Sequence, residues 1–176
     1  MNPWEIKAES VERLFIEQHR AELKFRLVKI EHCLNQLTDE DIWWRPYEEH
    51  NAIGNIILHC CGNMRQWLID GLNQTPDVRD RPGEFASRDR IAKEELLNRL
   101  RDTINEADAA IASIGPDELL SPRRIQGFDV TAQSAILDSV AHLGGHTQEI
   151  IWITRLRLGV DYQFYWVPQS PEQGAP

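Results

Sequence analysis

Two histidines of this 176-residue chain stand four positions apart, in the segment 140–147 with the sequence Val-Ala-His-Leu-Gly-Gly-His-Thr. In a helix, side chains four residues apart lie on one face, so the imidazoles of His142 and His146 would be close enough to share a metal ion. A chain with six histidines can also carry such a pair by chance, and two core histidines bonded to backbone carbonyls are the competing interpretation. The pair alone therefore leaves metal binding and core packing open.

Two glycines, Gly144 and Gly145, stand between these histidines. Glycine destabilises a helix interior by about 1 kcal/mol relative to alanine, so two in succession need a reason. We expect the backbone of a neighbouring element, or a ligand, to approach closely at this point.

A third histidine, His59, lies at the margin of an apolar segment with the sequence Ile56-Ile-Leu-His-Cys-Cys-Gly62. Taken alone it is more typical of a core histidine. However, an inward histidine on one helix that faces an i, i+4 pair on another is how helical bundles build metal sites. We therefore predict that one divalent metal ion binds to His59, His142 and His146. The remaining histidines lack such a setting: His19, His32 and His50.

Three neutral imidazoles leave at least one coordination position open, which is typical of a catalytic rather than a closed structural metal site. Such an ion can bind a thiolate or acidify a bound water, and imidazole suits zinc and nickel equally. Three polar residues within a turn of the predicted ligands are candidate hydrogen-bond partners for them, although a solvated position is the competing interpretation for each: Asn55, Asp138 and Glu149.

The three cysteines of the chain, Cys33, Cys60 and Cys61, form no Cys-x-x-Cys pair and no disulfide framework. We expect small buried side chains in a reducing compartment. Neither Cys60 nor Cys61 has an evident activating neighbour, which disfavours either as a nucleophile.

Helices must position these residues. Apolar residues recur at helical spacing in four long segments, approximately 9–36, 52–72, 90–114 and 131–158. Thr38 should cap a short helix that stops before Pro46, and Asn51 should cap the second long helix. These patterns predict an all-α fold, a four-helix up-down bundle over residues 1–165, followed by a flexible tail over 166–176.

Two connections between the long helices have sequence patterns that indicate a specific local structure. The stretch 73–89 loses all periodicity and contains Pro76, Pro82 and Gly83, which predicts a long surface loop between the second and third helices. Loops of this length usually have a function. The stretch 120–130 has weak β character around Gly127, so a short hairpin fits there.

Composition excludes several classes of function. The apolar fraction of 41% and charged fraction of 27% are those of one folded domain. A net charge of −9 repels nucleic-acid phosphates and anionic lipid, so we expect neither partner. With no apolar run long enough for a membrane span and no signal-peptide pattern in the first residues, we expect a cytoplasmic protein.

Several motifs together resemble the DinB-like superfamily of bacterial four-helix metalloproteins. They are the Asn-x-Ile-x-His pattern that ends at His59, the His-x-x-x-His pair, the acidic-basic segment 77–85, and the segment 125–131 with the sequence Ile-Gln-Gly-Phe-Asp-Val-Thr. The resemblance extends from about residue 9 to residue 165, and the last two segments look like one branch of unknown function.

This resemblance implies a four-helix bundle, often a homodimer, with zinc or nickel on three side chains at the positions of His59, His142 and His146. Some relatives carry Glu at the position of His142. Characterised relatives include thiol-cofactor S-transferases and the mycothiol-dependent maleylpyruvate isomerase. The implied function is a metal-dependent enzyme that directs a low-molecular-weight thiol to an electrophilic small-molecule substrate. A metal-dependent hydrolase and a non-enzymatic, stress-related binding module with a structural metal remain the alternatives.

Overall fold

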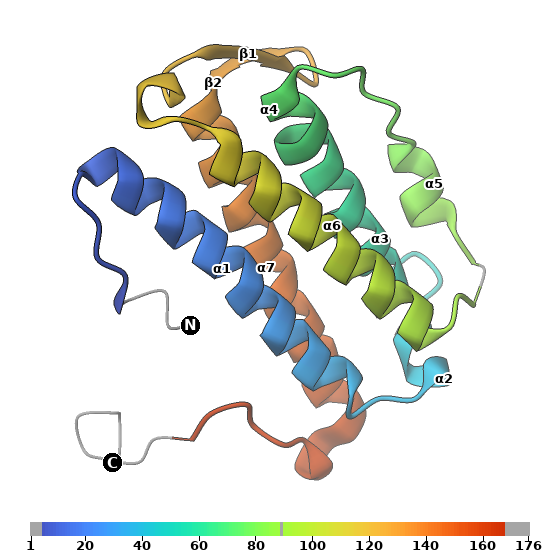
Figure 1. Cartoon of the computed structure of the whole chain (residues 1–176). Helices are drawn as coiled ribbons and strands as arrows, with labels where there is room; N and C mark the ends of the chain where they lie inside the picture. The colour runs from blue at the N-terminus through green and yellow to red at the C-terminus, as the bar shows by residue number, and fades with distance from the viewer. Residues whose placement is uncertain (1–4, 89, 168–176) are drawn as a thin grey trace.

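A computed structural model describes residues 5–88 and 90–167 and shows a mainly helical molecule with one small sheet (Figure 1). The elements, in chain order, are α1 (Val11–Leu34), α2 (Asp39–Ile42), α3 (Ile53–Met64), η2 (Arg65–Asp70), α4 (Gly71–Asn73), α5 (Arg81–Ala86), α6 (Lys93–Ser113), η3 (Pro116–Glu118), β1 (Pro122–Ile125), β2 (Phe128–Thr131), α7 (Ala132–Leu158) and η4 (Gly159–Asp161).

The long helices lie side by side around one core (Figure 1). Helix α1 packs against α6 and α7, and α3 packs against the same two helices from the other side. Their apolar stripes meet in a single cluster of buried side chains, in which Leu23, Ile57, Leu100 and Ile136 are fully inaccessible. The predicted mainly helical fold is confirmed.

Of the two predicted helix caps, the one at Thr38 is present and the one at Asn51 is not. Thr38 caps α2, where its hydroxyl accepts a hydrogen bond from the Asp41 amide at 3.2 Å. The second long helix begins at Ile53 after Ala52, so the prediction that Asn51 caps it was wrong. Asn55 closes this end instead, since its Oδ1 accepts a hydrogen bond from the Ala52 amide at 3.2 Å.

The predicted helix over 52–72 is continuous but not uniform. After α3 the chain widens into the π-helical segment η2 and returns to α-helix in α4. Gln74, with φ of 57°, ends the helix in the left-handed conformation. A π-helical turn contains an extra residue, and such turns are frequent beside functional sites.

The stretch 73–89 is not wholly irregular, because its middle forms α5. Asp80 begins this helix by accepting a hydrogen bond from the Gly83 amide at 3.1 Å, and Pro82 fits its first turn. Helix α5 packs along α3 (Figure 1). The expectation of a loop without elements was therefore wrong over Arg81–Ala86.

The weakly indicated hairpin is present. Strands β1 and β2 pair antiparallel, from Pro122 opposite Thr131 to Ile125 opposite Phe128. The two residues of the turn, Gln126 and Gly127, have positive φ values of 52° and 84°, as a tight hairpin turn requires.

The chain beyond α7 returns along α1. Gln163 is held there by Gln36, whose Oε1 accepts its amide at 2.7 Å, and its carbonyl lies 2.7 Å from His32 Nε2. Residues 168–176 of the predicted tail lie outside the described residues. Within the described parts of the chain, no helix has the length and apolar character needed to cross a membrane.

Candidate metal centre

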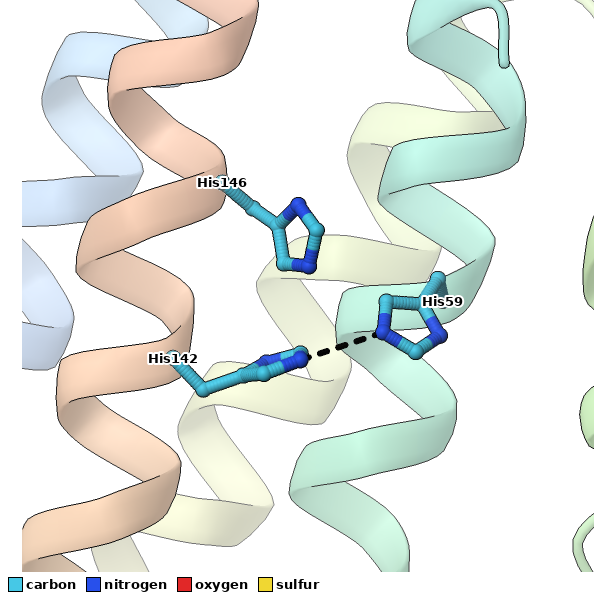
Figure 2. A group of neighbouring side chains, drawn as sticks. All are labelled: His59, His142 and His146. Atoms are coloured by element: carbon cyan, nitrogen blue, oxygen red, sulfur yellow. Dashed lines mark hydrogen bonds between the residues drawn. The ribbon is translucent and has the colours of Figure 1, made fainter. Parts of the chain in front are cut away.

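Three histidines from two helices converge on one point. His59 projects from α3, and His142 and His146 project from α7 toward it (Figure 2). Their nitrogens include three that all lie within 4.8 Å of one another, and His59 Nε2 lies 3.1 Å from His142 Nε2. The structure thus brings together all three predicted residues.

The other three histidines lie elsewhere and have local partners. His19 contacts the Phe15 carbonyl at 2.7 Å, and His32 contacts the Gln163 carbonyl. His50 lies beside the Tyr47 ring, 5.4 Å between centroids. None of them contributes to the cluster.

Burial keeps the two inner imidazoles neutral. Desolvation is the main cause that lowers the pKa of His142 to about 4, and the neighbouring histidines and arginines add to it. Desolvation also lowers the pKa of His59, against an opposing hydrogen bond from Glu84. Since a metal ion binds neutral imidazole, both rings are in the binding form at neutral pH.

A carboxylate from the segment after α4 orients the His59 ring. Glu84 Oε2 lies 3.0 Å from His59 Nδ1, and the Phe85 ring lies against the imidazole with 4.6 Å between centroids. Arg79 Nη2 also lies 3.0 Å from Nδ1, but it donates to the same Oε2 at 2.8 Å. We assign the proton to Nδ1, because a carboxylate is the stronger acceptor and the bond is then charge-assisted. This tautomer leaves Nε2 free for an ion.

The Glu84 carboxylate is itself fixed by a buried ion pair. Arg79 Nε donates to Oε1 at 2.7 Å and Nη2 donates to Oε2, in the two-pronged geometry that arginine favours. The side chains of Arg79 and Glu84 are only 5% and 10% exposed. Gln66, in η2, accepts from Arg79 Nη1 at 2.9 Å and so completes the support.

Space for this carboxylate exists because residue 62 is a glycine. A β-carbon added at Gly62 would overlap Glu84 Oε1 and lie 2.7 Å from its Cδ. By contrast, a β-carbon at Gly145 would meet nothing within 4 Å, and one at Gly144 would lie 3.7 Å from Arg26 Nε. The backbone approach that we expected at Gly144 and Gly145 is therefore not found among the described residues, whereas a close approach, by the Glu84 side chain, occurs at Gly62 on the opposite helix.

Of the three predicted hydrogen-bond partners of the ligands, only Glu149 contacts one of the histidines. Glu149 Oε2 lies 2.8 Å from His146 Nδ1, which leaves the Nε2 of that ring free. Asn55 contacts the segment after α4 rather than a ligand, and Asp138 is exposed. Sequence analysis missed Glu84 and Arg79. The unexplained length of their segment and the helical Gly62 were the available signals.

The cysteines beside His59 have no nucleophilic character. Burial is the main cause that raises the pKa of Cys61 to about 11 and the pKa of Cys60 well above its ordinary value. Both thiols are therefore protonated at neutral pH, and the thiolate is the reactive form.

The donor set fits a divalent ion. Two nitrogens that share a tetrahedral zinc at about 2.1 Å stand roughly 3.4 Å apart, so the His59–His142 separation is already close to that spacing. Among the described residues, none hydrogen-bonds to the buried His142 Nδ1, so this ring makes its hydrogen bond through Nε2, which faces His59. The arrangement can hold one ion and leave a position open.

Comparisons with known proteins agree with this description of the fold. A conserved protein of Enterococcus faecalis superposes with a TM-score of 0.69 at 16% identity, over 86% of this chain and 99% of that one. A DinB-like protein of Bacillus cereus ATCC 10987 superposes with a TM-score of 0.63 at 13% identity, over 85% and 97%. No curated protein matches the sequence. A family model, described as "Protein of unknown function (DUF1572)", matches residues 10–171. The chain therefore belongs to the DUF1572 family, a branch of unknown function that is structurally similar to DinB-like proteins.

Proposed function

We propose that the protein binds one divalent metal ion through His59, His142 and His146, in a site that keeps one coordination position open. The observation that carries this proposal is the convergence of three imidazoles from α3 and α7, with the inner two held neutral by burial. Zinc and nickel both suit three imidazoles. The homodimer, the up-down bundle over residues 1–165 and the cytoplasmic location belong to the same proposal as expectations.

The activity we propose is the transfer of a low-molecular-weight thiol to an electrophilic small molecule. When bound, the ion would supply a Lewis acid that holds the thiol as its thiolate. Because Cys60 is buried and the thiols of Cys60 and Cys61 are both protonated, a sulfur nucleophile would have to come from outside the chain. The His146 side chain is 25% exposed and that of His59 only 6%, so we place access on the His146 side.

Two alternatives use the same three imidazoles. A hydrolase would place water where we place the thiol. A non-enzymatic module would use the ion to tie α3 to α7, and the origin of the ligands on these two helices favours it as the second candidate.

Metal binding is tested by the zinc and nickel content of protein purified without an affinity tag. We expect one ion per chain, and alanine replacement of His59, His142 or His146 should each abolish stoichiometric binding. Replacement of His19, His32 or His50 provides the matched controls, which should retain the ion. If the three site variants take up metal as the parent does, the proposed site is wrong.

Experiments on the cobalt-substituted protein distinguish thiol transfer, hydrolysis and a purely structural role of the ion. A thiol that binds the ion should change the visible spectrum of the parent, and His146→Ala should remove the change. Turnover of esters or amides without thiol would instead favour the hydrolase. If no thiol reaches the ion and its removal lowers only the melting temperature, the structural module is correct.

A further inference from the structure

Two side chains of the segment 75–88 reach His59 Nδ1, and of these Glu84 is the acceptor and Arg79 a donor. Glu84 reaches from α5 across to α3 and contacts the Nδ1 face of His59, opposite the face turned to His142. We propose that Glu84 is a positioning residue for His59, delivered by the docked segment 75–88, and that metal affinity therefore depends on this docking. The inference rests on the proposed metal site and adds to it the device that controls one ligand.

The first support is the fate of His59 without the carboxylate. Arg79 Nη2 lies 3.0 Å from His59 Nδ1, and a guanidinium can only donate. With Glu84 absent, Nδ1 would accept from Arg79 and the ring proton would move to Nε2. That proton would block the nitrogen that faces the ion, so Glu84 decides which tautomer is present.

The second support is charge. The pair of Arg79 and Glu84 is neutral as a whole, so a cation can bind beside it. Loss of Glu84 would leave the buried positive charge of Arg79 within one imidazole ring of a divalent ion. Both the tautomer and the charge therefore act in the same direction, against metal binding.

The third support is that the segment has a dedicated anchor. Asn55 is fully buried on α3, and its Nδ2 donates to the carbonyls of Glu84 and Ser87, both at 3.0 Å. Gln66 donates to Asp77 Oδ2 at 2.5 Å and holds the beginning of the segment to η2. These hydrogen bonds hold the backbone and the Asp77 side chain of the segment against α3 and η2, and so they fix the position of Glu84.

Gly62 offers a variant that displaces the carboxylate and leaves every charge in place. Gly62→Ala adds only a methyl group, which would overlap Glu84 Oε1, the far end of a flexible side chain, and lie 3.0 Å from Arg79 Nε. Alanine is the better helix former, so α3 itself should not suffer. Gly145→Ala is the matched control, since it adds the same methyl group between His142 and His146, where it would meet nothing.

The test measures two quantities in the parent, Gly62→Ala, Glu84→Ala, Glu84→Gln and Gly145→Ala. Nitrogen-15 NMR of the imidazoles in metal-free protein reports the tautomer of His59. Competition with a chromophoric chelator reports zinc affinity and stoichiometry.

We expect the Nδ1–H tautomer in the parent and in Gly145→Ala, and its loss in Gly62→Ala and Glu84→Ala. Zinc affinity should fall about 10–100-fold in those two variants with the stoichiometry unchanged, the usual effect of removing a carboxylate behind a metal ligand. Glu84→Gln keeps one acceptor oxygen and should lose less. Parent-like tautomer and affinity in Gly62→Ala and Glu84→Ala would overturn the inference alone. A parent that takes up no zinc would instead overturn the proposed metal site, and the inference with it.

Discussion

The three imidazoles differ in how the chain surrounds them, and this difference has a consequence for pH. Desolvation lowers the pKa of His142 to about 4, whereas histidine in an unfolded chain titrates near 6.5. As pH falls from about 6.5 to 4, the unfolded state binds a proton at His142 before the folded state does. The stability of the folded metal-free protein should therefore decrease through this window and be unaffected by His142 above it.

We predict that this pH dependence is reduced in His142→Gln. Glutamine stays neutral at every pH, so the variant lacks the proton uptake that favours unfolding. Urea denaturation of both metal-free proteins between pH 7.5 and 4.5 measures the effect. The stability difference between parent and variant should shift in favour of the variant as the pH falls. A difference that is constant with pH would show that the pKa of His142 is the same in the folded and unfolded states.

Asn55 joins α3 to the segment 75–88 through hydrogen bonds that do not involve the ligands of the proposed site. Asn55→Ala removes two donated bonds of 3.0 Å to the carbonyls of Glu84 and Ser87, and it also removes the acceptor of the Ala52 amide. We predict a loss of about 2–4 kcal/mol in the free energy of unfolding, from these bonds and the penalty for unsatisfied buried groups. Urea denaturation checks it. Asn73→Ala, which removes one exposed contact to the Ile69 carbonyl, should change the free energy by less than about 1 kcal/mol.

At the scale of elements, sequence periodicity predicted the long helices. It did not predict the short helix α5 or the π-helical turn η2, which depend on local interactions. The four long segments, the Thr38 cap and the hairpin around Gly127 follow from apolar spacing and turn residues. Helix α5 is too short and too exposed to show periodicity, and its signals were Asp80 as a cap and Pro82 in the first turn. The π-helical turn η2 leaves no trace in a 3.6-residue pattern, because it adds one residue to a helix that continues on both sides.

The same limit applies to the site. The histidines could be predicted because i, i+4 spacing on one helix is a local property of the sequence. Glu84 and Arg79 could not, because their partnership with His59 depends on how an exposed segment docks on α3. Gly62 is also a glycine inside a predicted helix and could have indicated a close approach at that point. The sequence analysis used the pair Gly144 and Gly145 instead, whose surroundings are open.

The hairpin turn provides a prediction about backbone conformation alone. Gly127 has φ of 84° and nothing within 4 Å of an added β-carbon, so Gly127→Ala tests the conformation and no contact. We predict a destabilisation of about 1 kcal/mol from the left-handed conformation. Thermal and urea unfolding measure it. Gly145→Ala, in the helical interior of α7, should instead stabilise by up to about 1 kcal/mol. If Gly127→Ala does not destabilise the protein, the backbone at Gly127 is not as described.

At the scale of the molecule, the proposed site joins parts of the chain that are distant in sequence. His59 belongs to α3, the histidine pair belongs to α7, and Glu84 joins the segment 75–88 to His59. An ion that binds the folded chain and not the unfolded one adds its binding free energy to the stability of the whole molecule. Opening of the segment and release of the ion should then be linked, because each favours the other.

We therefore predict that metal removal lowers the melting temperature of the parent. At a free ion concentration about 100 times the dissociation constant, the stabilisation is about 2.7 kcal/mol, which for a chain of this length corresponds to roughly 5–10 °C. Calorimetry with added zinc and with a chelator measures the difference. His146→Ala should melt at one temperature in both conditions, since it keeps the fold but loses a ligand. If the chelator does not change the melting temperature of the parent, the proposal that the folded protein holds a metal ion is contradicted. Protection of the segment from trypsin at Arg79 and Arg88, present with zinc and lost with chelator, would show that the ion and the segment are bound together.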